Sequence, residues 1–253
     1  MVNLLHNKMP EKELKIYPVK IDKKRLGEID CGILPKIPHL ILAVGSVKAG
    51  KTTLYNSLYL HPDFYGDKFQ VKILLSPTAH QDEVNTHLVN IFDYVIDEVD
   101  DNVINELVDM IKNDQSDNKY IMLFDDVVGS LQQNKSGKPD ILSQLCTKYR
   151  HIGSEEGGEG KLSIFIATQY FKFLTPIIRN NASGYFFCGN ASQNELKSIA
   201  ENLSVFGGSE KKFIEIYKKA KKEPFDILYL NMEQLKAHRN FGEVLFKPED
   251  LQK

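Results

Sequence analysis

The sequence predicts an α/β fold in which helices cover both faces of a mostly parallel central sheet. Short apolar runs alternate with segments of helical spacing, and this alternation is typical of βαβ units. The runs 39–45 and 162–169 are apolar almost throughout, which indicates strands that are buried on both faces. The run 120–126 ends in two acids, and parallel sheets bind their ligands at the carboxyl ends of their strands.

The expected elements follow from these two patterns in chain order. Strands are predicted where short, mostly apolar runs are bounded by polar or glycine-rich segments: 39–45, 71–76, 92–97, 120–126, 162–169, 184–189 and, as the last strand, 225–230. Helices are predicted where apolar residues recur three and four positions apart: 51–60, 102–111, 139–152, 193–203 and 209–222. The Gly/Glu-rich insert GSEEGGEGK (153–161) is expected to be an exposed, flexible loop.

The chain is expected to have three parts. Residues 1–36 form a polar, basic arm, in which LKIYPVKI (14–21) is a candidate edge strand because it alternates and carries Pro18. Residues 37–232 form the core that holds the predicted strands and helices. Residues 233–253 are expected to be a C-terminal tail.

Composition excludes several classes of protein. The chain has 253 residues, a formal net charge of −2, and no run near the roughly 18 apolar residues of a membrane span. The N-terminus lacks the apolar core of a signal peptide. Three scattered cysteines favour a reducing compartment over a disulfide framework or a zinc site. Because the net charge is near zero, DNA would have to be handled by local patches or by assembled subunits.

The strongest motif lies between the first predicted strand and the first helix. Gly45, Gly50, Lys51 and Thr52 match GxxxxGK[ST], the phosphate-binding P-loop. The glycines let backbone N–H groups turn inward around a phosphate, and the new helix adds its N-terminal dipole. Lys51 is expected to reach the β- and γ-phosphates, and the Thr52 hydroxyl to bind Mg²⁺. The expected nucleotide-binding residues are Gly45, Ser46, Val47, Lys48, Ala49, Gly50, Lys51, Thr52 and Thr53.

A P-loop needs an acid at the end of a neighbouring strand, and YIMLFDD (120–126) supplies two. Asp125 is the expected metal acid, and Asp126 is the candidate base that polarises the attacking water. The alternative is that both carboxylates cap the next segment. FIATQ also ends a strand in a polar side chain, and the amide of Gln169 is a candidate sensor of the γ-phosphate. Alone, Gln169 would be interpreted as a strand-end residue that faces water.

Adenine is the expected base. Asp126 and Gly129 also form DxxG, and NKSG (134–137) is similar to the guanine-reading NKxD of GTPases. However, Gly137 occupies the position where an acid must contact guanine, and the tetrapeptide follows too closely to come after another strand. The sequence therefore favours ATP over GTP.

The order of these motifs resembles that of the genome-packaging ATPases of nucleocytoplasmic large DNA viruses and virophages, the poxvirus-type branch of the FtsK–HerA superfamily. The resemblance runs from about residue 37 to residue 246 and includes GSVKAGKTT, LLSPT, MLFDDV, YRH before SIFIATQ, IIRNNA and PFDILYLN. Walker motifs are shared by many ATPases. The order of the double acid, Arg-His, ATQ and Ile-Arg-Asn is what makes the resemblance specific.

The resemblance implies a RecA-like P-loop domain with an extra strand between the Walker A and Walker B strands. It also implies catalytic roles for Lys51 and Asp126 and a sensor role for Gln169. Arg150 would be an arginine finger that acts on a neighbouring subunit, with Arg179 as the second candidate. The insert 153–161 departs from the usual pattern, because it lengthens the gap between the finger and the sensor strand.

The expected function is ATP-driven translocation of double-stranded viral DNA into a preformed capsid. The expected cofactors are ATP and Mg²⁺, and the expected assembly is a ring, either a pentamer or a hexamer. DNA and viral capsid proteins are the expected partners, no membrane is involved, and the location is the host cytoplasm, a viral factory or the virion. Three alternatives remain: a conjugation or secretion pump of the same superfamily, a small-molecule kinase, and a nucleotide-gated assembly factor with little turnover.

Overall fold

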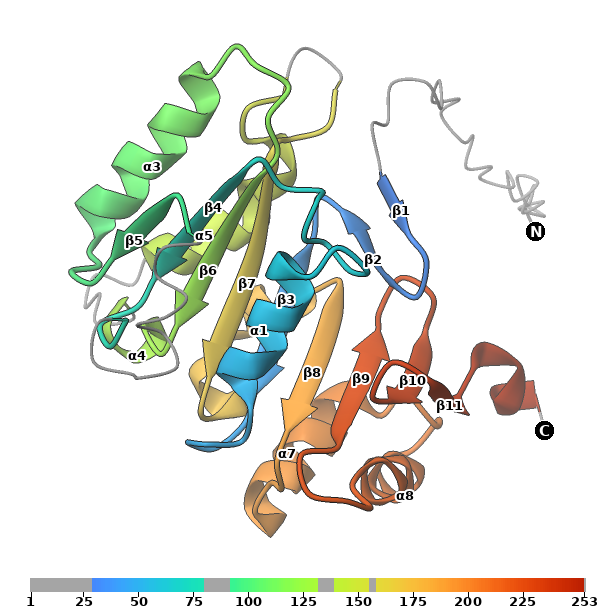
Figure 1. The fold of residues 1–253 in the computed structure, drawn as a ribbon. Helices are drawn as coiled ribbons and strands as arrows, with labels where there is room; N and C mark the ends of the chain where they lie inside the picture. Colours follow the sequence, from blue (N-terminus) through green and yellow to red (C-terminus); the bar gives the residue numbers. More distant parts are fainter. Residues whose placement is uncertain (1–28, 80–91, 132–138, 155–157, 253) are drawn as a thin grey trace, which may run out of the picture.

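The computed structural model of the protein describes residues 29–79, 92–131, 139–154 and 158–252. These residues form a nine-stranded mixed sheet, helices on its two faces, and a separate two-stranded hairpin (Figure 1). The candidate edge strand at 14–21 and the guanine-like tetrapeptide at 134–137 lie outside the described residues. Among the described residues, no helix is long and apolar enough to cross a membrane.

The large sheet has the strand order β11-β10-β9-β8-β3-β7-β6-β4-β5. Its strands are β3 (Leu40–Val44), β4 (Val71–Leu75), β5 (Tyr94–Ile96), β6 (Tyr120–Asp125), β7 (Leu162–Thr168), β8 (Gly184–Cys188), β9 (Ile227–Asn231), β10 (Lys236–Arg239) and β11 (Glu243–Phe246). The strands from β8 to β5 are parallel, whereas β9, β10 and β11 add an antiparallel edge. The predicted α/β fold with a mostly parallel sheet is confirmed.

The strand that carries the P-loop lies at the centre of the parallel part. β3 pairs with β7 from Leu40 opposite Ile164, and with β8 from Ile41 opposite Gly184. Since β7 separates β3 from β6, the predicted extra strand between the Walker A and Walker B strands is confirmed. The carboxyl ends of β3, β6 and β7 therefore meet at one edge of the sheet.

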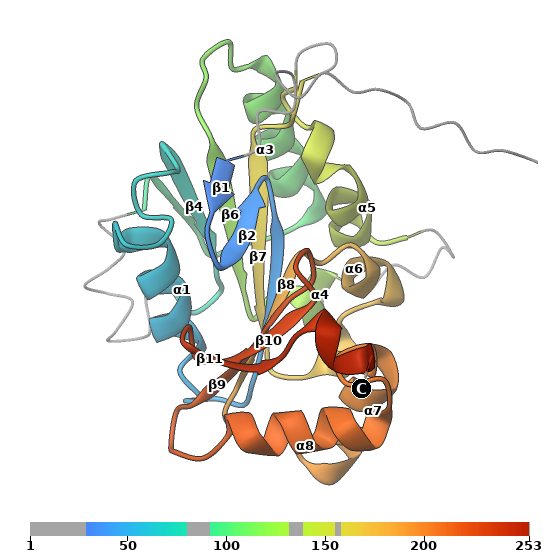
Figure 2. The ribbon, with the colours of Figure 1, turned by 90° about the vertical axis from the view of Figure 1, so that its right-hand side faces the viewer.

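Helices cover both faces of the sheet, as predicted. α1 (Lys51–Leu60) covers one face, where Tyr55 and Tyr59 pack in the same buried cluster as Ile41 and Ala43 (Figure 2). The opposite face carries Leu40 and its neighbours, packed against the other helices: α3 (Asp101–Asn113), α5 (Ile141–Lys148), α6 (Pro176–Asn180), α7 (Gln193–Leu203) and α8 (Glu210–Ala220). A short α4 (Val128–Leu131) follows β6. Because successive residues of a central strand face opposite helical layers, these strands are mostly apolar.

The helix after the P-loop begins differently from the others. Five helices follow a side chain that accepts a hydrogen bond from a backbone N–H of the first turn, and these caps are Asp100, Asp140, Thr175, Ser192 and Ser209. α1 instead follows Gly50, which has φ +92° and makes no such bond. The first N–H groups of α1 therefore have no side-chain cap, and a bound anion can take that role.

Two parts of the fold differ from the prediction. The prediction that 225–230 is the last strand is wrong, because β10 and β11 pair after it and extend the sheet. β1 (Ile29–Cys31) and β2 (Leu34–Ile37) form a hairpin that was not expected. All four of these strands are short, and polar residues such as His238 interrupt the apolar runs by which strands are recognised. The division at residue 232 into a core and a tail stays a prediction.

Candidate active site

The candidate active site is at the carboxyl edge of the sheet, where three strand ends are joined. The backbone N–H of Gly45 donates to the carbonyl of Thr168 over 3.1 Å, which connects the ends of β3 and β7. The N–H of Asp126 donates to the carbonyl of Ala167 over 3.2 Å, which connects β6 to the same strand. These bonds fix the P-loop, the double acid and the ATQ segment side by side.

The P-loop packs tightly at its start and opens to solvent further on. A Cβ at Gly45 would lie 2.4 Å from the carbonyl oxygen of Cys188, so only glycine fits there. Lys48 has φ +63° and Gly50 has φ +92°, which turns the loop back into α1. The exposed fraction of Val47 is 64%, so the tip of the loop is accessible to a ligand.

Lys51 is held inside the mouth of the loop. Its side chain is only 7% exposed, and its Nζ donates to the carbonyls of Gly45 over 2.9 Å and Ser46 over 3.2 Å. The Lys51 side chain therefore reaches across the loop from its end to its start. Phosphate oxygens in the loop would lie within reach of this charge.

The first acid lies against the P-loop helix. Asp125 is buried, and its Oδ2 accepts a hydrogen bond from the Tyr55 hydroxyl over 3.3 Å. Tyr55 is four residues after Lys51 and shares its face of α1, so this bond holds the carboxylate beside the start of the helix. Sequence reasoning missed Tyr55, because its spacing on α1 is that of any core residue of a helix.

Thr52 and Asp125 form a donor set that fits Mg²⁺. A hydroxyl and a carboxylate supply oxygen ligands, which this ion prefers, and P-loop sites leave its other positions to phosphate and water. No group of three or more His, Cys, Asp or Glu residues gathers among the described residues. A site that uses one threonine, one acid and the nucleotide needs no such group.

The second acid and the candidate sensor are in direct contact. Asp126 is exposed, has φ +54°, and accepts a hydrogen bond at Oδ2 from Gln169 Nε2 over 3.2 Å. A cavity of about 240 Å³ opens beside them, and Gly45, Ser46 and Gln169 contribute to its lining. Burial raises the pKa of the adjoining Cys188 thiol to about 11, so this thiol carries no charge near pH 7. Gln169 thus faces a space next to the P-loop.

Arg150 lies at the other edge of the sheet, in the 3₁₀ turn Tyr149–His151 that follows α5. Its Nε donates to the Tyr149 hydroxyl over 2.8 Å, and its Nη2 lies 3.5 Å from Oγ of Ser183, next to the amino end of β8. β3 alone spans about 17 Å at roughly 3.3 Å per residue, so Arg150 cannot reach the P-loop of its own chain.

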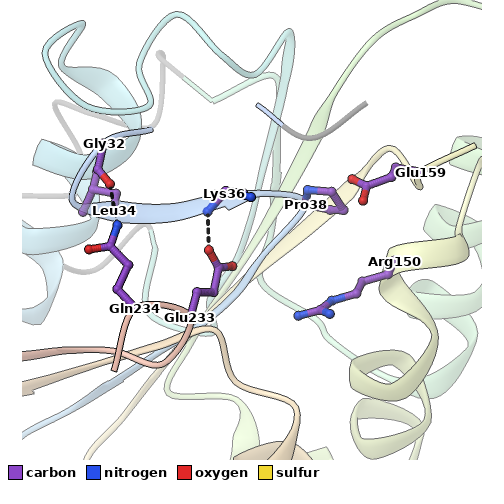
Figure 3. A pocket seen from close by; sticks show the side chains of 8 residues that line it. All are labelled: Gly32, Leu34, Lys36, Pro38, Arg150, Glu159, Glu233 and Gln234. Carbon is purple, nitrogen blue, oxygen red and sulfur yellow. Dashed lines mark hydrogen bonds between the residues drawn. The ribbon is translucent and has the colours of Figure 1, made fainter. Parts of the chain in front are cut away.

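Arg150 instead points into a cavity of about 410 Å³ (Figure 3). On the far wall, the backbone N–H of Lys36 donates to the Glu233 carboxylate (Figure 3). Glu159 lies above the guanidinium of Arg150 in the same view. This cavity is remote from the P-loop and from both acids. Its size does not make it the catalytic site, because the phosphate-binding chemistry lies elsewhere.

Arg179 packs against an aromatic ring. It lies at the end of α6, where its Cζ is 4.9 Å from the centroid of the Phe171 ring. Its Nε is buried without a hydrogen-bond partner among the described residues. The structure of one chain therefore brings Lys51, Asp125, Asp126 and Gln169 to one edge and places Arg150 away from it, whereas Arg179 packs on Phe171, two residues after Gln169.

Comparisons with known proteins agree with this architecture. No protein-family model and no curated protein matches the chain. Its fold is similar to that of the genome packaging NTPase B204 from Sulfolobus turreted icosahedral virus 2 in complex with AMP, with 19% sequence identity, a TM-score of 0.58, and coverage of 79% of this chain and 96% of that one. B204, the DNA-packaging ATPase from Sulfolobus turreted icosahedral virus, gives 16% identity and a TM-score of 0.58, over 80% and 96%.

A second kind of protein has a similar fold. The pCW3 conjugation coupling protein TcpA, in its monomer form with ATPγS, shares 13% identity at a TM-score of 0.51. The alignment covers 90% of this chain and 68% of that one. Together these comparisons show that the chain has the fold of P-loop NTPases, and that its structural neighbours include viral genome-packaging and conjugation coupling ATPases.

Proposed function

We propose that this protein is an ATP-driven motor that moves double-stranded DNA into a preformed viral capsid. The observation that carries the proposal is the contact of Asp126 with Gln169 over 3.2 Å beside the P-loop, in a fold similar to that of packaging ATPases. A base for water and a γ-phosphate sensor in contact are suited to couple hydrolysis to movement. The proposed assembly is a pentameric or hexameric ring that meets capsid proteins in the host cytoplasm, a viral factory or the virion.

Nucleotide binding in this proposal uses groups that the loop already presents. Backbone N–H groups after Gly45 that make no bond within the loop, together with the Lys51 ammonium, would bind the phosphates, and the uncapped start of α1 favours an anion. Thr52 and Asp125 would hold Mg²⁺, which supplies positive charge against the β- and γ-phosphate oxygens. Tyr55 would keep the Asp125 carboxylate in position for that role.

Hydrolysis in this proposal depends on the second acid. Asp126 would orient the attacking water and accept its proton. The Gln169 amide, bonded to Asp126, would change its hydrogen bonds when the γ-phosphate leaves, since it can both donate and accept. Because Gln169 directly follows β7, a change in its hydrogen bonds on loss of the γ-phosphate would act on that strand. The opposite end of β7 is close to Arg150, since the N–H of Gly160 donates to the Arg150 carbonyl.

The test measures ATP hydrolysis with and without linear double-stranded DNA, together with particle mass in the presence of a non-hydrolysable ATP analogue. The proposal expects DNA to raise the turnover rate and the analogue to give the mass of a ring. Adding empty capsids should then protect DNA from nuclease only while ATP is present. A monomer that ignores DNA and transfers phosphate to a nucleoside would instead be a kinase.

A conjugation coupling ATPase is the second candidate, because the fold is also similar to that of TcpA. Such a pump would share the stimulation by DNA and the assembly of subunits. It would not protect DNA inside capsids. The nuclease measurement therefore separates the two candidates when the ATPase measurement does not.

Gln169→Ala is expected to lower DNA-stimulated hydrolysis by roughly tenfold, with ATP affinity little changed. The change removes the hydrogen bond to the Asp126 carboxylate, and a bond to a charged group contributes about 1.5–3 kcal/mol. The measurements are ATP consumed per base pair moved and the dissociation constant for ATP. Gln144→Ala is the matched control, since Gln144 is exposed on α5 and its amide donates to the carbonyl of Pro139. Equal coupling ratios in Gln169→Ala and wild type would leave Gln169 as a strand-end residue.

A further inference from the structure

Phe225 is an exposed aromatic residue beside the P-loop. It lies in the turn between α8 and β9, and its exposed fraction of 72% is the highest among the large apolar residues that the structure describes. A Cβ at Gly50 would lie 3.9 Å from Phe225 Cδ1, which is van der Waals distance. The ring edge therefore lies next to the point where the P-loop enters α1, although the two segments are far apart in sequence.

Phe225 and the acids lie on opposite sides of the P-loop strand. In the sheet, β7 and β6 follow β3 on one side, whereas β8 and β9 follow it on the other. Asp126 and Gln169 come from the ends of β6 and β7, and Phe225 immediately precedes Asp226 and β9. A nucleotide with its γ-phosphate at the acids and its phosphates in the loop would extend its base toward Phe225.

The turn that carries Phe225 is fixed by the buried carboxylate of the next residue. Asp226 accepts hydrogen bonds from Arg239 Nε over 2.8 Å, from Asn240 Nδ2 over 3.0 Å and from the N–H of Glu223 over 2.8 Å. Burial raises the pKa of Asp226, but these hydrogen bonds and the Arg239 charge outweigh it and hold that pKa well below its usual range. Lys221, the residue after α8, also holds the turn, because its Nζ donates to the carbonyl of Asp226 over 2.7 Å.

The backbone of Phe225 itself is in an unfavourable conformation. Its φ of +66° lies in the left-handed region, which bulky side chains rarely adopt. Such residues persist only where the surroundings determine them, and they are concentrated at ligand-binding positions. Here the hydrogen bonds to Asp226 fix the turn in this conformation. The Phe225 ring is therefore exposed to solvent next to the P-loop.

We propose that Phe225 stacks on the nucleobase of the nucleoside triphosphate whose phosphates the P-loop binds. This inference rests on the proposed nucleotide binding, and it adds a base subsite to it. Every nucleobase has a face on which an aromatic ring can stack, so Phe225 contributes affinity for the base without selecting adenine by hydrogen bonds. The ligand expected to use this subsite is a nucleoside triphosphate, whereas inorganic tripolyphosphate would bind to the loop alone.

The first experiment compares dissociation constants of AMP-PNP and of inorganic tripolyphosphate for the full chain and for Phe225→Ala. Loss of one base stack should weaken AMP-PNP binding by roughly 5- to 150-fold and leave tripolyphosphate binding unchanged. Val244→Ala is the matched control, because Val244 is 51% exposed on β11, which β10, β9 and β8 separate from β3. Equal AMP-PNP affinity in Phe225→Ala and wild type, or an equal loss for both ligands, would overturn the base subsite.

The second experiment reads the contact directly. The chain has no tryptophan, so Phe225→Trp introduces a single tryptophan, which can be excited at wavelengths that tyrosine does not absorb. AMP-PNP is expected to quench its emission and tripolyphosphate is not, while the emission of Val244→Trp should respond to neither ligand. Unchanged emission of Phe225→Trp with saturating AMP-PNP contradicts stacking. Wild-type protein that binds neither ligand would instead overturn the proposed nucleotide binding, and the subsite with it.

Discussion

Arg150→Ala is expected to lower ATP hydrolysis by roughly 10³–10⁵-fold while ATP still binds. The P-loop and Lys51 would surround the phosphates from one side, and Asp125 would hold Mg²⁺ on another, which would leave the outer γ-oxygens without a positive partner. An arginine suits that position because its planar group stays charged and contacts two phosphate oxygens at once. Arg150 is at the amino edge of the sheet and exposed, so it can supply this charge only to a neighbouring subunit.

Mixing two inactive variants tests this shared site. Lys51→Ala removes the ammonium that spans the loop and should weaken nucleotide binding, whereas Arg150→Ala leaves the loop intact. In a mixed ring, some sites combine an intact Lys51 with an intact Arg150 from the next subunit, so part of the hydrolysis should return. Steady-state ATPase rates at several mixing ratios of the two variants measure this recovery. No recovery in rings of verified mixed composition would exclude Arg150 and leave Arg179.

Two controls separate catalysis from folding. Arg150 bonds to Tyr149 and approaches Ser183, so the melting temperature of Arg150→Ala must be compared with that of wild type. Arg150→Lys keeps the charge but loses the planar group, and it should remain well below wild-type rate. Arg179→Ala tests the second candidate. Because Arg179 packs on Phe171, this variant is expected to change stability more than hydrolysis.

Asp126→Asn is expected to bind ATP with wild-type affinity and to hydrolyse it roughly 10²–10⁴-fold more slowly. Asparagine keeps the size of the side chain and can still contact Gln169, but it cannot accept a proton from water. The P-loop and Asp125 are unaffected by the change. Single-turnover hydrolysis and equilibrium binding of ATP are the measurements.

The control for Asp126→Asn is the same change at an exposed acid elsewhere. Asp109→Asn on α3 removes a surface ion pair with Lys112, and it should leave hydrolysis unchanged. Hydrolysis by Asp126→Asn at the wild-type rate would show that Asp126 is not the base. The P-loop assignment would survive that result, whereas the assignment of the double acid would need revision.

The central strands and their polar ends could be predicted from the sequence because both depend on local patterns. β3 and β7 are buried on both faces, which makes β3 apolar throughout and β7 apolar except at Ser163 and Thr168. Asp126 and Gln169 are 43 residues apart, yet their contact follows from a general property of parallel strands, whose carboxyl ends share an edge. Site residues that directly follow parallel strands can therefore be predicted from the sequence.

Other features depend on contacts that no local pattern encodes. β10 and β11 are short and partly polar, and they become strands because β9 offers an edge to pair with. Phe225 looks like an ordinary apolar residue in sequence, and only the fold brings its turn beside Gly50. Tyr55 fits the helical pattern of any core residue, while its hydroxyl bonds to Asp125.

The position of β3 has a consequence for synthesis of the chain. β3 is made well before both of its neighbours, since Leu40 pairs with Ile164 and Ile41 with Gly184. At roughly 5–20 residues per second, a ribosome needs about 6–25 s to reach β7 after completing β3. A nascent chain that ends before residue 162 contains neither neighbour, so its most apolar strand waits unpaired. The phosphate-binding loop is thus translated well before the strands that give it its final surroundings.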